Sequence, residues 1–307
     1  MRFTHLHEQI YCRPWFITAG AHYTIRQLFS DHLLRHGPLA DELDISALVN
    51  PRVPLMVDDQ GIATLHVLGP LGKNLSRLEQ SCGATGFEQI HAELAAANDH
   101  PDVRGILLHV NSPGGTVQGT PEAAAAVAAS AKPVVAYTED IMASAAYYLA
   151  AGARQIVASP SADVGAIGVY IPWVDRSAAF ATQGLKPDPI VNTGGDLKAL
   201  GFTGTLTDEQ RAFLQEQVDA DFAAFKDHVL AHRAVADTAL RGQTLSGPSA
   251  LSTNLVDYAG NLATAKAILL GLKVPLVATR LLVPVLADWL RANRRAFWPN
   301  SLRLREL

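Results

Sequence analysis

The chain has 307 residues, of which 49% are hydrophobic and 18% charged, with a formal net charge of −4 and a pI near 6.2. This composition is typical of a globular protein with one large or two modest domains, and its slightly acidic balance argues against a nucleic-acid-binding surface. The two cysteines, Cys12 and Cys82, have no second Cys or His at metal-ligand spacing. We therefore predict no disulfide framework, no metal, no cofactor and a reducing, cytoplasmic setting.

Residues 1–55 are predicted to form a helical N-terminal extension. Apolar residues recur near helical spacing over Tyr23–Arg35, and Pro51 and Pro54 close the region. No apolar run of about 18 residues occurs anywhere in the chain, so we expect neither a secretory leader nor a transmembrane segment.

Residues 56–270 are predicted to form the main domain, because short apolar segments alternate there with helical ones. Strands are expected at 62–68, 105–110, 133–137 and 156–158, and helices at 87–98, 120–131 (with Thr120 as N-cap) and from Ser144 onward. This alternation predicts an α/β fold with a largely parallel sheet. In such sheets the chemistry sits on loops at the carboxyl ends of the strands.

A long amphipathic helix is predicted after Leu200. Thr207–Gln210 has the pattern of a capping box. Apolar residues then recur every three or four positions: Leu214, Val218, Phe222, Phe225 and Val229. Such a helix packs either on its own domain or against a neighbouring subunit.

Residues 271–307 form a basic, amphipathic C-terminal tail with six arginines after residue 279. The tail is interpreted as a helix on the protein's own surface, with a membrane-surface or partner-binding helix as the alternative.

A glycine-rich turn follows the apolar run at 105–110, in the segment Asn111-Ser112-Pro113-Gly114-Gly115. Adjacent glycines let the backbone turn sharply and present free N–H groups. Such groups stabilise an oxyanion in many enzymes, although a plain strand-to-helix turn explains this segment equally well.

Ser144 follows a predicted strand and begins a run of small residues, Ser144-Ala145-Ala146, that reads as a helix. A serine at a helix N-terminus lies at the positive end of the helix dipole, which favours a developing alkoxide. Small neighbours leave room for a substrate backbone. The competing interpretation is that Ser144 is an ordinary N-cap.

A serine nucleophile requires a base, and the histidines are poor candidates. His109 alternates with strand residues and His228 lies within the predicted long helix. Among the downstream lysines, Lys186 lies in a solvated turn, Lys226 lies in the long helix, and Lys198 lies in a glycine-rich loop. A lysine acts as a base only when burial lowers its pKa far enough to leave the amine neutral.

These segments together resemble the signal peptide peptidase A (protease IV) family of serine peptidases, which includes phage head-assembly proteases. The resemblance covers roughly 61–260. Its landmarks, in the family's order and spacing, are Ile106–Gly115, Lys132–Ala136, Ala143–Tyr148, Val164–Val169, the Lys198 loop and Leu255–Asp257.

The resemblance implies a Clp protease/crotonase-like fold with repeated ββα units. It also implies a Ser-Lys dyad in which Ser144 is the nucleophile and Lys198 the general base. Backbone N–H groups at Gly114, Gly115 and Ala145 are expected to form the oxyanion hole and substrate-binding loop. The implied substrate is a polypeptide and the implied assembly a homo-oligomer.

Three departures from the family pattern refine this expectation. Ala145 and Ala146 replace a usual Gly-Gly pair, Ala166 replaces a serine that often precedes Ile-Gly, and the family's membrane anchor is missing. These features look more like the phage and prophage branch. By analogy, capsid or scaffold proteins are expected as substrates, in a bacterial host cytoplasm or a phage prohead.

Two other functions remain open at this stage. The first is a catalytically silent scaffold or assembly homologue, which the absence of a serine at Ala166 favours and the presence of Ser144 and Lys198 disfavours. The second is a crotonase-like enzyme acting on acyl-CoA, which leaves Ser144 and Lys198 unexplained.

Overall fold

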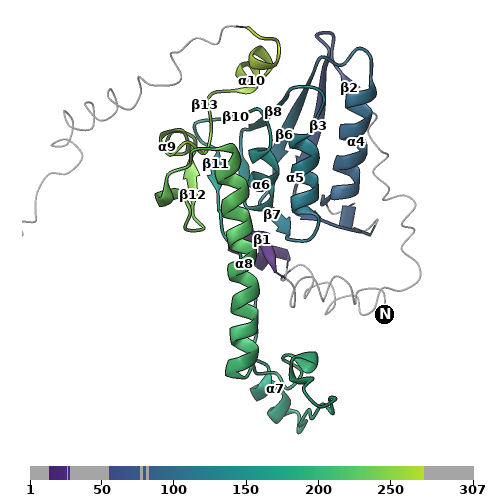
Figure 1. The fold of residues 1–307 in the computed structure, drawn as a ribbon, viewed down its shortest axis with the longest axis vertical. Coiled ribbons are helices and arrows are strands. Elements are labelled where there is room, and N and C mark those ends of the chain that lie inside the picture. The colour runs from purple at the N-terminus through teal and green to yellow at the C-terminus, as the bar shows by residue number, and fades with distance from the viewer. Residues whose placement is uncertain (1–13, 26, 28–54, 77–78, 81–82, 273–307) are drawn as a thin grey trace, which may run out of the picture.

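The computed structural model describes residues 14–25, 27, 55–76, 79–80 and 83–272. Most of the predicted helix at 23–35, much of the N-terminal extension and nearly all of the arginine-rich tail lie outside these residues. Figure 1 shows a body of sheets and helices from which one long helix runs away to a small distal part of the chain.

The body is organised around a six-stranded sheet. Its strands, in spatial order, are β13 (Tyr258–Ala259), β10 (Gln155–Ala158), β8 (Val134–Thr138), β6 (Gly105–Asn111), β3 (Ile62–Leu68) and β2 (Met56–Val57). All neighbours are parallel except β2, which is antiparallel to β3. The four strands expected from the sequence are therefore confirmed, and so is the parallel sheet.

From β5 to β11, successive strands alternate between this sheet and two smaller ones. One small sheet has the order β1 (Trp15–Ile17), β7 (Gly114–Thr116), β4 (Leu71–Gly72), β5 (Thr85–Gly86). The other has the order β12 (Thr244–Ser246), β11 (Asp163–Gly165), β9 (Ile141–Ala143). Thus β6 is followed by β7 and a helix, and β8 by β9 and a helix. This repetition is the ββα unit that the resemblance implied.

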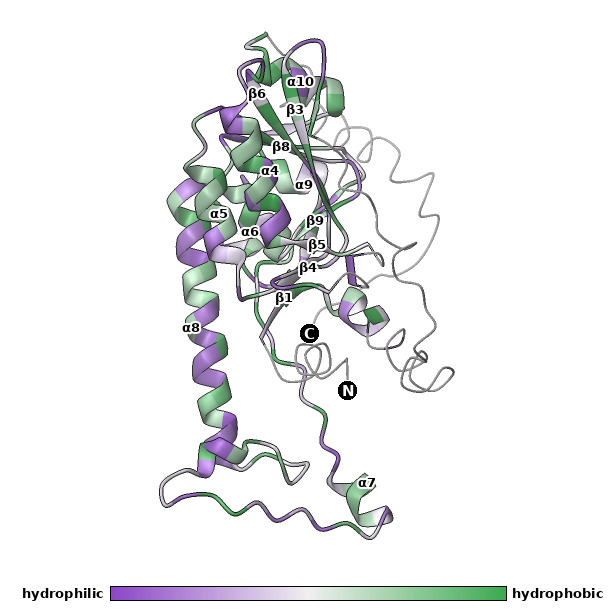
Figure 2. Cartoon of the chain, turned by 90° about the vertical axis from the view of Figure 1, so that its right-hand side faces the viewer, coloured by the Kyte–Doolittle hydropathy of each residue, from purple (hydrophilic) through white to green (hydrophobic). Residues whose placement is uncertain are grey.

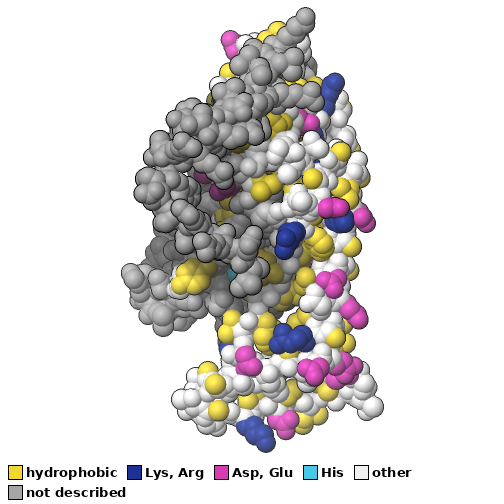
Figure 3. All heavy atoms as spheres, turned by 90° about the vertical axis from the view of Figure 1, so that its left-hand side faces the viewer, with side chains coloured by type: hydrophobic (Ala, Val, Ile, Leu, Met, Phe, Trp, Pro, Cys, Tyr) yellow, Lys and Arg dark blue, Asp and Glu magenta, His cyan; other side chains and the backbone are white. Residues whose placement is uncertain are grey.

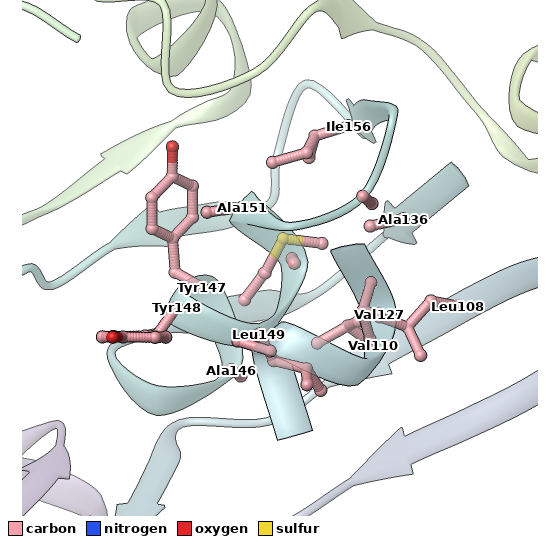
Figure 4. Packing of buried hydrophobic residues seen from close by; sticks show 14 of the residues in the cluster. Leu108, Val110, Val127, Ala136, Ala146, Tyr147, Tyr148, Leu149, Ala151 and Ile156 are labelled. Carbon is pink, nitrogen blue, oxygen red and sulfur yellow. The ribbon is translucent and has the colours of Figure 1, made fainter. Parts of the chain in front are cut away.

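Three helices cover one face of the main sheet, and one covers the other (Figure 2). The first group is α4 (Phe87–Asp99), α5 (Thr120–Ala128) and α6 (Ala145–Ala151), and the second is α10 (Leu262–Leu269). Leu108 and Val110 of β6 pack with Val127 of α5 and Leu149 of α6 (Figure 4). Each fully buried aliphatic side chain of this kind contributes roughly 1.5–3 kcal/mol, so this packing holds α6 against the main sheet.

Two sequence expectations need correction. Thr120 is the first residue of α5 rather than its N-cap, because Gly119 takes the cap position with a left-handed backbone, and the Thr120 hydroxyl donates to the Thr116 carbonyl. The N-terminal extension is not purely helical either. Residues 15–17 form strand β1, which pairs antiparallel with β7 of the body, before a short helix at 19–25.

The long helix α8 (Asp208–His232) begins with the predicted capping box, formed by Thr207 and Gln210. Only part of its apolar stripe is buried. Phe225 and Val229 are fully buried in the body, whereas Leu214 and Val218, nearer the start, remain half-exposed. The helix therefore packs on its own domain over its C-terminal half and extends beyond the domain over its N-terminal half (Figure 2).

The segment between β11 and α8 leaves the body and forms what we call the distal arm, residues 171–207. It contains α7 (Ser177–Thr182) and a short 3-10 helix, η2 (Asp196–Ala199). A hydrogen bond from Arg176 N–H to the Gly204 carbonyl closes the arm, and the Gln210 side chain attaches η2 to the start of α8 by donating to the Asp196 carbonyl. Gly204 is the only buried residue of the arm.

Candidate active site

Ser144 occupies a sharp turn between β9 and α6. Its backbone has φ 55° and ψ −117°, and the side chain is only 1% exposed. The Ser144 N–H donates to the Gly165 carbonyl at 2.7 Å, and its own carbonyl accepts from Tyr148 N–H at 2.8 Å. A non-glycine residue in such a conformation costs of order 1–3 kcal/mol and persists only where its surroundings enforce it.

The hydroxyl of Ser144 does not cap the helix. Although Ser144 stands at the N-cap position of α6, its side chain makes no capping hydrogen bond. The N-cap interpretation accounts for serine at such positions through that bond, so it does not explain this residue. A strained turn that presents an uncommitted hydroxyl is the geometry expected of a nucleophile.

The glycine-rich turn lies directly against this serine turn. Ser112 N–H donates to the Ile141 carbonyl at 2.8 Å, and the Ser112 carbonyl accepts from Ala143 N–H at 3.1 Å. Backbone hydrogen bonds to β9, just before Ser144, therefore join the two motifs.

Both glycines of the turn are required by close packing. Gly114 has φ 107°, and a Cβ there would lie 2.1 Å from the Phe16 carbonyl oxygen; at Gly115 it would lie 1.9 Å from that of Leu71. The Gly114 N–H donates to the Ser112 hydroxyl at 3.2 Å. Of the two glycine N–H groups expected at an oxyanion hole, that of Gly114 is thus engaged within its own turn.

The helix that follows Ser144 is fixed from the far end of the domain. The Tyr147 hydroxyl, fully buried, donates to the Leu255 carbonyl at 2.8 Å. Two residues on, the Asp257 carboxylate accepts from Ile156 N–H and from the Arg233 guanidinium. The Leu255–Asp257 landmark therefore positions α6 and β10.

Ala166 continues the wall that accepts the Ser144 N–H. It is buried, has φ 52°, and its N–H donates to the Gln243 carbonyl at 2.8 Å. Ser144 and Ala166 are two of the four non-glycine residues with positive φ in the described chain, and the Ser144–Gly165 hydrogen bond links them. The methyl group at Ala166 leaves this wall without a hydroxyl.

Lys198 lies in the distal arm, on η2, and its side chain is exposed. Its helix is attached to Gln210 near the start of α8, whereas α6 contacts the same helix at Phe225, where the ring centroids of Tyr148 and Phe225 are 4.9 Å apart. Fifteen residues of helix between Gln210 and Phe225 span about 22 Å. A single chain therefore does not bring Lys198 to Ser144. Figure 1 shows α7 of the same arm at the far end of α8 from α6.

Neither histidine considered from the sequence stands beside Ser144 as a base. His109 lies on the sheet face opposite α6, where it stacks on Tyr137 and its Nε2 is 3.3 Å from Glu139. His228 stacks on the Tyr148 ring at 4.1 Å and its Nε2 donates to the Tyr148 carbonyl. Sequence reasoning placed His228 in a helix but missed this contact with α6, which no local pattern signals.

The histidine stack has an electrostatic consequence. Burial, together with the nearby His232, lowers the pKa of His228 to about 4. The ring is therefore neutral near pH 7 and acts as a hydrogen-bond donor to α6.

The described residues bear on two further kinds of site, membrane spans and metal sites. None of their helices is long and apolar enough to cross a membrane. The same residues contain no group of three His, Cys, Asp or Glu side chains arranged to hold a metal ion.

Comparison with known proteins shows similarity to several phage and bacterial proteins. Capsid assembly protease C of Escherichia phage lambda is 32% identical over 204 residues, which cover 64% of this chain and 46% of that protein. Head-tail preconnector protein GP5 of Enterobacteria phage P21 is 29% identical over 210 residues, which cover 67% and 42%. Protease 4 of Salmonella typhi is 31% identical over 201 residues, which cover 62% and 32%.

The chain thus spans less than half the length of each of these three relatives. The sequence model of Peptidase family S49 matches residues 126–273, from within α5 to just beyond α10. The match includes the Ser144 turn, Ala166, the distal arm and Leu255–Asp257. Residues 126–273 therefore resemble a Peptidase family S49 domain, whereas β3, β6 and the glycine-rich turn lie outside the match.

Proposed function

We propose that this protein is a serine endopeptidase in which Ser144 is the nucleophile and Lys198 the general base. The observation that carries the proposal is the strained Ser144 turn, whose hydroxyl caps no helix although it stands at an N-cap. Its position within a Peptidase family S49 match adds support.

The base in this proposal comes from a second copy of the chain. A lysine must lose its proton to act as a base, and burial favours the neutral amine, yet Lys198 is exposed on an arm directed away from its own Ser144. Docking of the arm against a neighbouring body would bury the lysine and complete the site. The functional form is therefore a homo-oligomer.

The surface of the arm supports such docking. Half of the large hydrophobic side chains exposed in the described chain lie on it: Val174, Leu185, Ile190, Val191, Leu197 and Phe202. Figure 3 shows hydrophobic side chains among charged ones on this part of the molecule, at the bottom of the view. Clustered exposed apolar groups mark interaction surfaces.

The proposed reaction proceeds through an acyl-enzyme. Neutral Lys198 takes the Ser144 proton as the oxygen attacks a peptide carbonyl, and N–H groups at Gly115 and Ala145 stabilise the oxyanion. The resulting ammonium protonates the leaving amine as the C–N bond breaks. Water, deprotonated by the same lysine, then hydrolyses the ester and regenerates Ser144.

We propose that the natural substrates are capsid or scaffold polypeptides of a phage or prophage, and that the enzyme cleaves them in the prohead or the host cytoplasm. Two relatives support this assignment by their names, a capsid assembly protease and a head-tail preconnector protein.

The first experiment compares wild type, Ser144→Ala, Lys198→Ala and Lys186→Ala on an unfolded protein substrate, with products identified by mass spectrometry. Lys186 is an exposed arm lysine like Lys198, so its variant is the matched control and should retain wild-type activity. The Ser144 and Lys198 variants should each lose at least about 10³-fold in rate. Equal cleavage by all four proteins would disprove the assignment, and absence of cleavage by wild type on capsid substrates as well would leave a silent scaffold protein.

The second experiment mixes Ser144→Ala with Lys198→Ala after subunit exchange. If each site combines a serine from one copy with a lysine from another, random pairing restores up to about one quarter of wild-type activity. A mixture as inactive as its components would show that the dyad, if present, lies within one chain.

A further inference from the structure

The N-terminal strand β1 is bonded along both of its edges. On one edge it pairs antiparallel with β7, with Phe16 opposite Gly115 and Ile17 opposite Gly114. On the other edge the Trp15 N–H donates to the Tyr170 carbonyl at 3.0 Å, and Tyr170 N–H donates back at 3.4 Å. The strand therefore fills a slot between the glycine-rich turn and the chain that leaves β11.

The register places the Phe16 peptide against the predicted oxyanion loop. Thr18 N–H donates to the Pro113 carbonyl at 3.0 Å, which makes Ile17 and Gly114 a non-hydrogen-bonded pair. The hydrogen-bonded pair is then Phe16 and Gly115, with the Phe16 backbone facing β7 and that of Trp15 facing Tyr170. While β1 is in place, its Phe16 carbonyl therefore accepts the Gly115 N–H that the proposed mechanism assigns to the oxyanion.

Both walls of the slot are attached to the Ser144 turn. Ser144 N–H donates to the carbonyl of Gly165, on the segment that runs on to Tyr170, while Ser112, two residues before β7, bonds to both neighbours of Met142. An extended chain held in this slot thus lies between the two backbone segments that flank the nucleophile.

The side chain at Phe16 enters a pocket of its own. Its ring lies 5.8 Å from that of Tyr148, one helical turn beyond Ser144, and 4.8 Å from that of Phe225. Phe16 is 1% exposed, and Trp15 and Ile17 on the opposite face of the strand are 4% exposed. The pocket therefore suits a large apolar or aromatic side chain.

We propose that this slot is the seat for an extended polypeptide with a bulky apolar residue at the Phe16 position, and that β1 occupies it as a built-in competitor. Addition of a strand to a free backbone edge is a general mode of peptide recognition, with backbone bonds giving affinity and side-chain pockets giving specificity. A substrate then binds only when the three-residue strand β1 leaves. This inference rests on the proposed peptidase function of Ser144.

The test locks β1 in place within the full chain. Trp15 and Thr116 face each other in the register as a non-hydrogen-bonded pair, where Cα atoms lie about 4.5 Å apart, within the range that a disulfide bridges. Trp15→Cys with Thr116→Cys is made in a background with Cys12→Ser and Cys82→Ser. The readouts are the labelling rate of Ser144 by a fluorophosphonate probe and cleavage of an unfolded protein.

Oxidation of the double variant should slow both labelling and cleavage by at least about 10-fold, with recovery on reduction and no change in either single-cysteine variant. An oxidised protein as active as the reduced one would overturn the inference. Absence of labelling and cleavage in every protein, wild type included, would instead reject the peptidase function.

Phe16→Ala provides a second test that does not depend on the disulfide. Emptying the pocket weakens β1, so labelling of Ser144 should become at least about 3-fold faster even though the protein is less stable. The matched control is Ile62→Ala, equally buried but on the α10 side of the sheet, which should not accelerate labelling. If β1 were only a structural strand, Phe16→Ala would leave labelling unchanged or slow it.

Discussion

The body and the distal arm of this chain hold the two proposed catalytic side chains in opposite environments. Ser144 is buried in a turn fixed by backbone hydrogen bonds to two neighbouring segments. Lys198 is exposed on a short 3-10 helix in a segment where only Gly204 is buried. The proposed nucleophile is thus fixed within one chain, whereas the proposed base is exposed to solvent in that chain.

The difference follows from how each region is stabilised. The body buries apolar side chains from strands and helices distant in the sequence, and such burial is the main favourable contribution to folding. The arm is held by local hydrogen bonds, such as that between Arg176 and Gly204, and exposes its apolar side chains. A region with so few buried apolar contacts opens at low free energy in a single chain.

The largest contrast is expected between two phenylalanines. Phe225→Ala removes a fully buried ring from the body and should lower the free energy of unfolding by about 3–5 kcal/mol. Phe202→Ala removes a ring that is 59% exposed on the arm and should change it by less than about 0.5 kcal/mol. Urea melts at high dilution measure both, and equal losses would mean that arm and body are packed alike in a single chain.

When subunit association is measured instead of unfolding, Phe202→Ala should have the larger effect. Phe202→Ala is expected to shift the assembled species toward single chains in sedimentation at micromolar concentration, because it removes part of the exposed apolar surface of the arm. Unchanged assembly would locate the subunit contact elsewhere.

A smaller effect is expected at the bond that fixes α6. Tyr147→Phe leaves the Leu255 carbonyl without its donor and should cost about 1–2 kcal/mol. Tyr258→Phe is the control, since that hydroxyl is only half-buried and accepts one long bond from Gln155. Thermal unfolding of the two variants separates them, and similar melting temperatures would contradict a positioning role for Tyr147.

The smallest effect depends on pH. Since the pKa of His228 in the folded protein is about 4, against about 6.5 when unfolded, the unfolded chain binds more protons between these values. The contribution of the neutral His228 ring to stability is complete above pH 6.5 and is lost as the pH falls toward 4. After allowance for solvent screening of the half-buried ring, the free energy of unfolding should fall by about 1 kcal/mol between pH 7 and 5. This corresponds to a decrease of about 2–4 °C in Tm.

His228→Phe keeps a ring against Tyr148 and removes the titration. The decrease in Tm between pH 7 and 5 should therefore be smaller in this variant than in wild type, as measured by calorimetry at both pH values. An identical decrease would assign the acid sensitivity to other groups.

Much of the body was predictable because its signals are local. The apolar runs at 62–68 and 105–110 became β3 and β6, and the Thr207–Gln210 capping box begins α8 as expected. Ser144 and the Gly114–Gly115 turn were also found from short patterns, since the strand before each motif and the small residues within it are contiguous in the chain.

The sequence by itself determined the strand-turn-helix elements and the residue types available for catalysis, because periodicity, capping and glycine content act over a few residues. Only the tertiary structure decided that residues 15–17 are a strand beside the Ser144 turn, that His228 stacks on Tyr148, and that Lys198 lies on an arm away from its own Ser144. These relations depend on contacts between segments far apart in the sequence, such as Trp15 with Thr116 and Tyr148 with His228. Their free energy comes from shared burial and strand pairing, which no local pattern encodes.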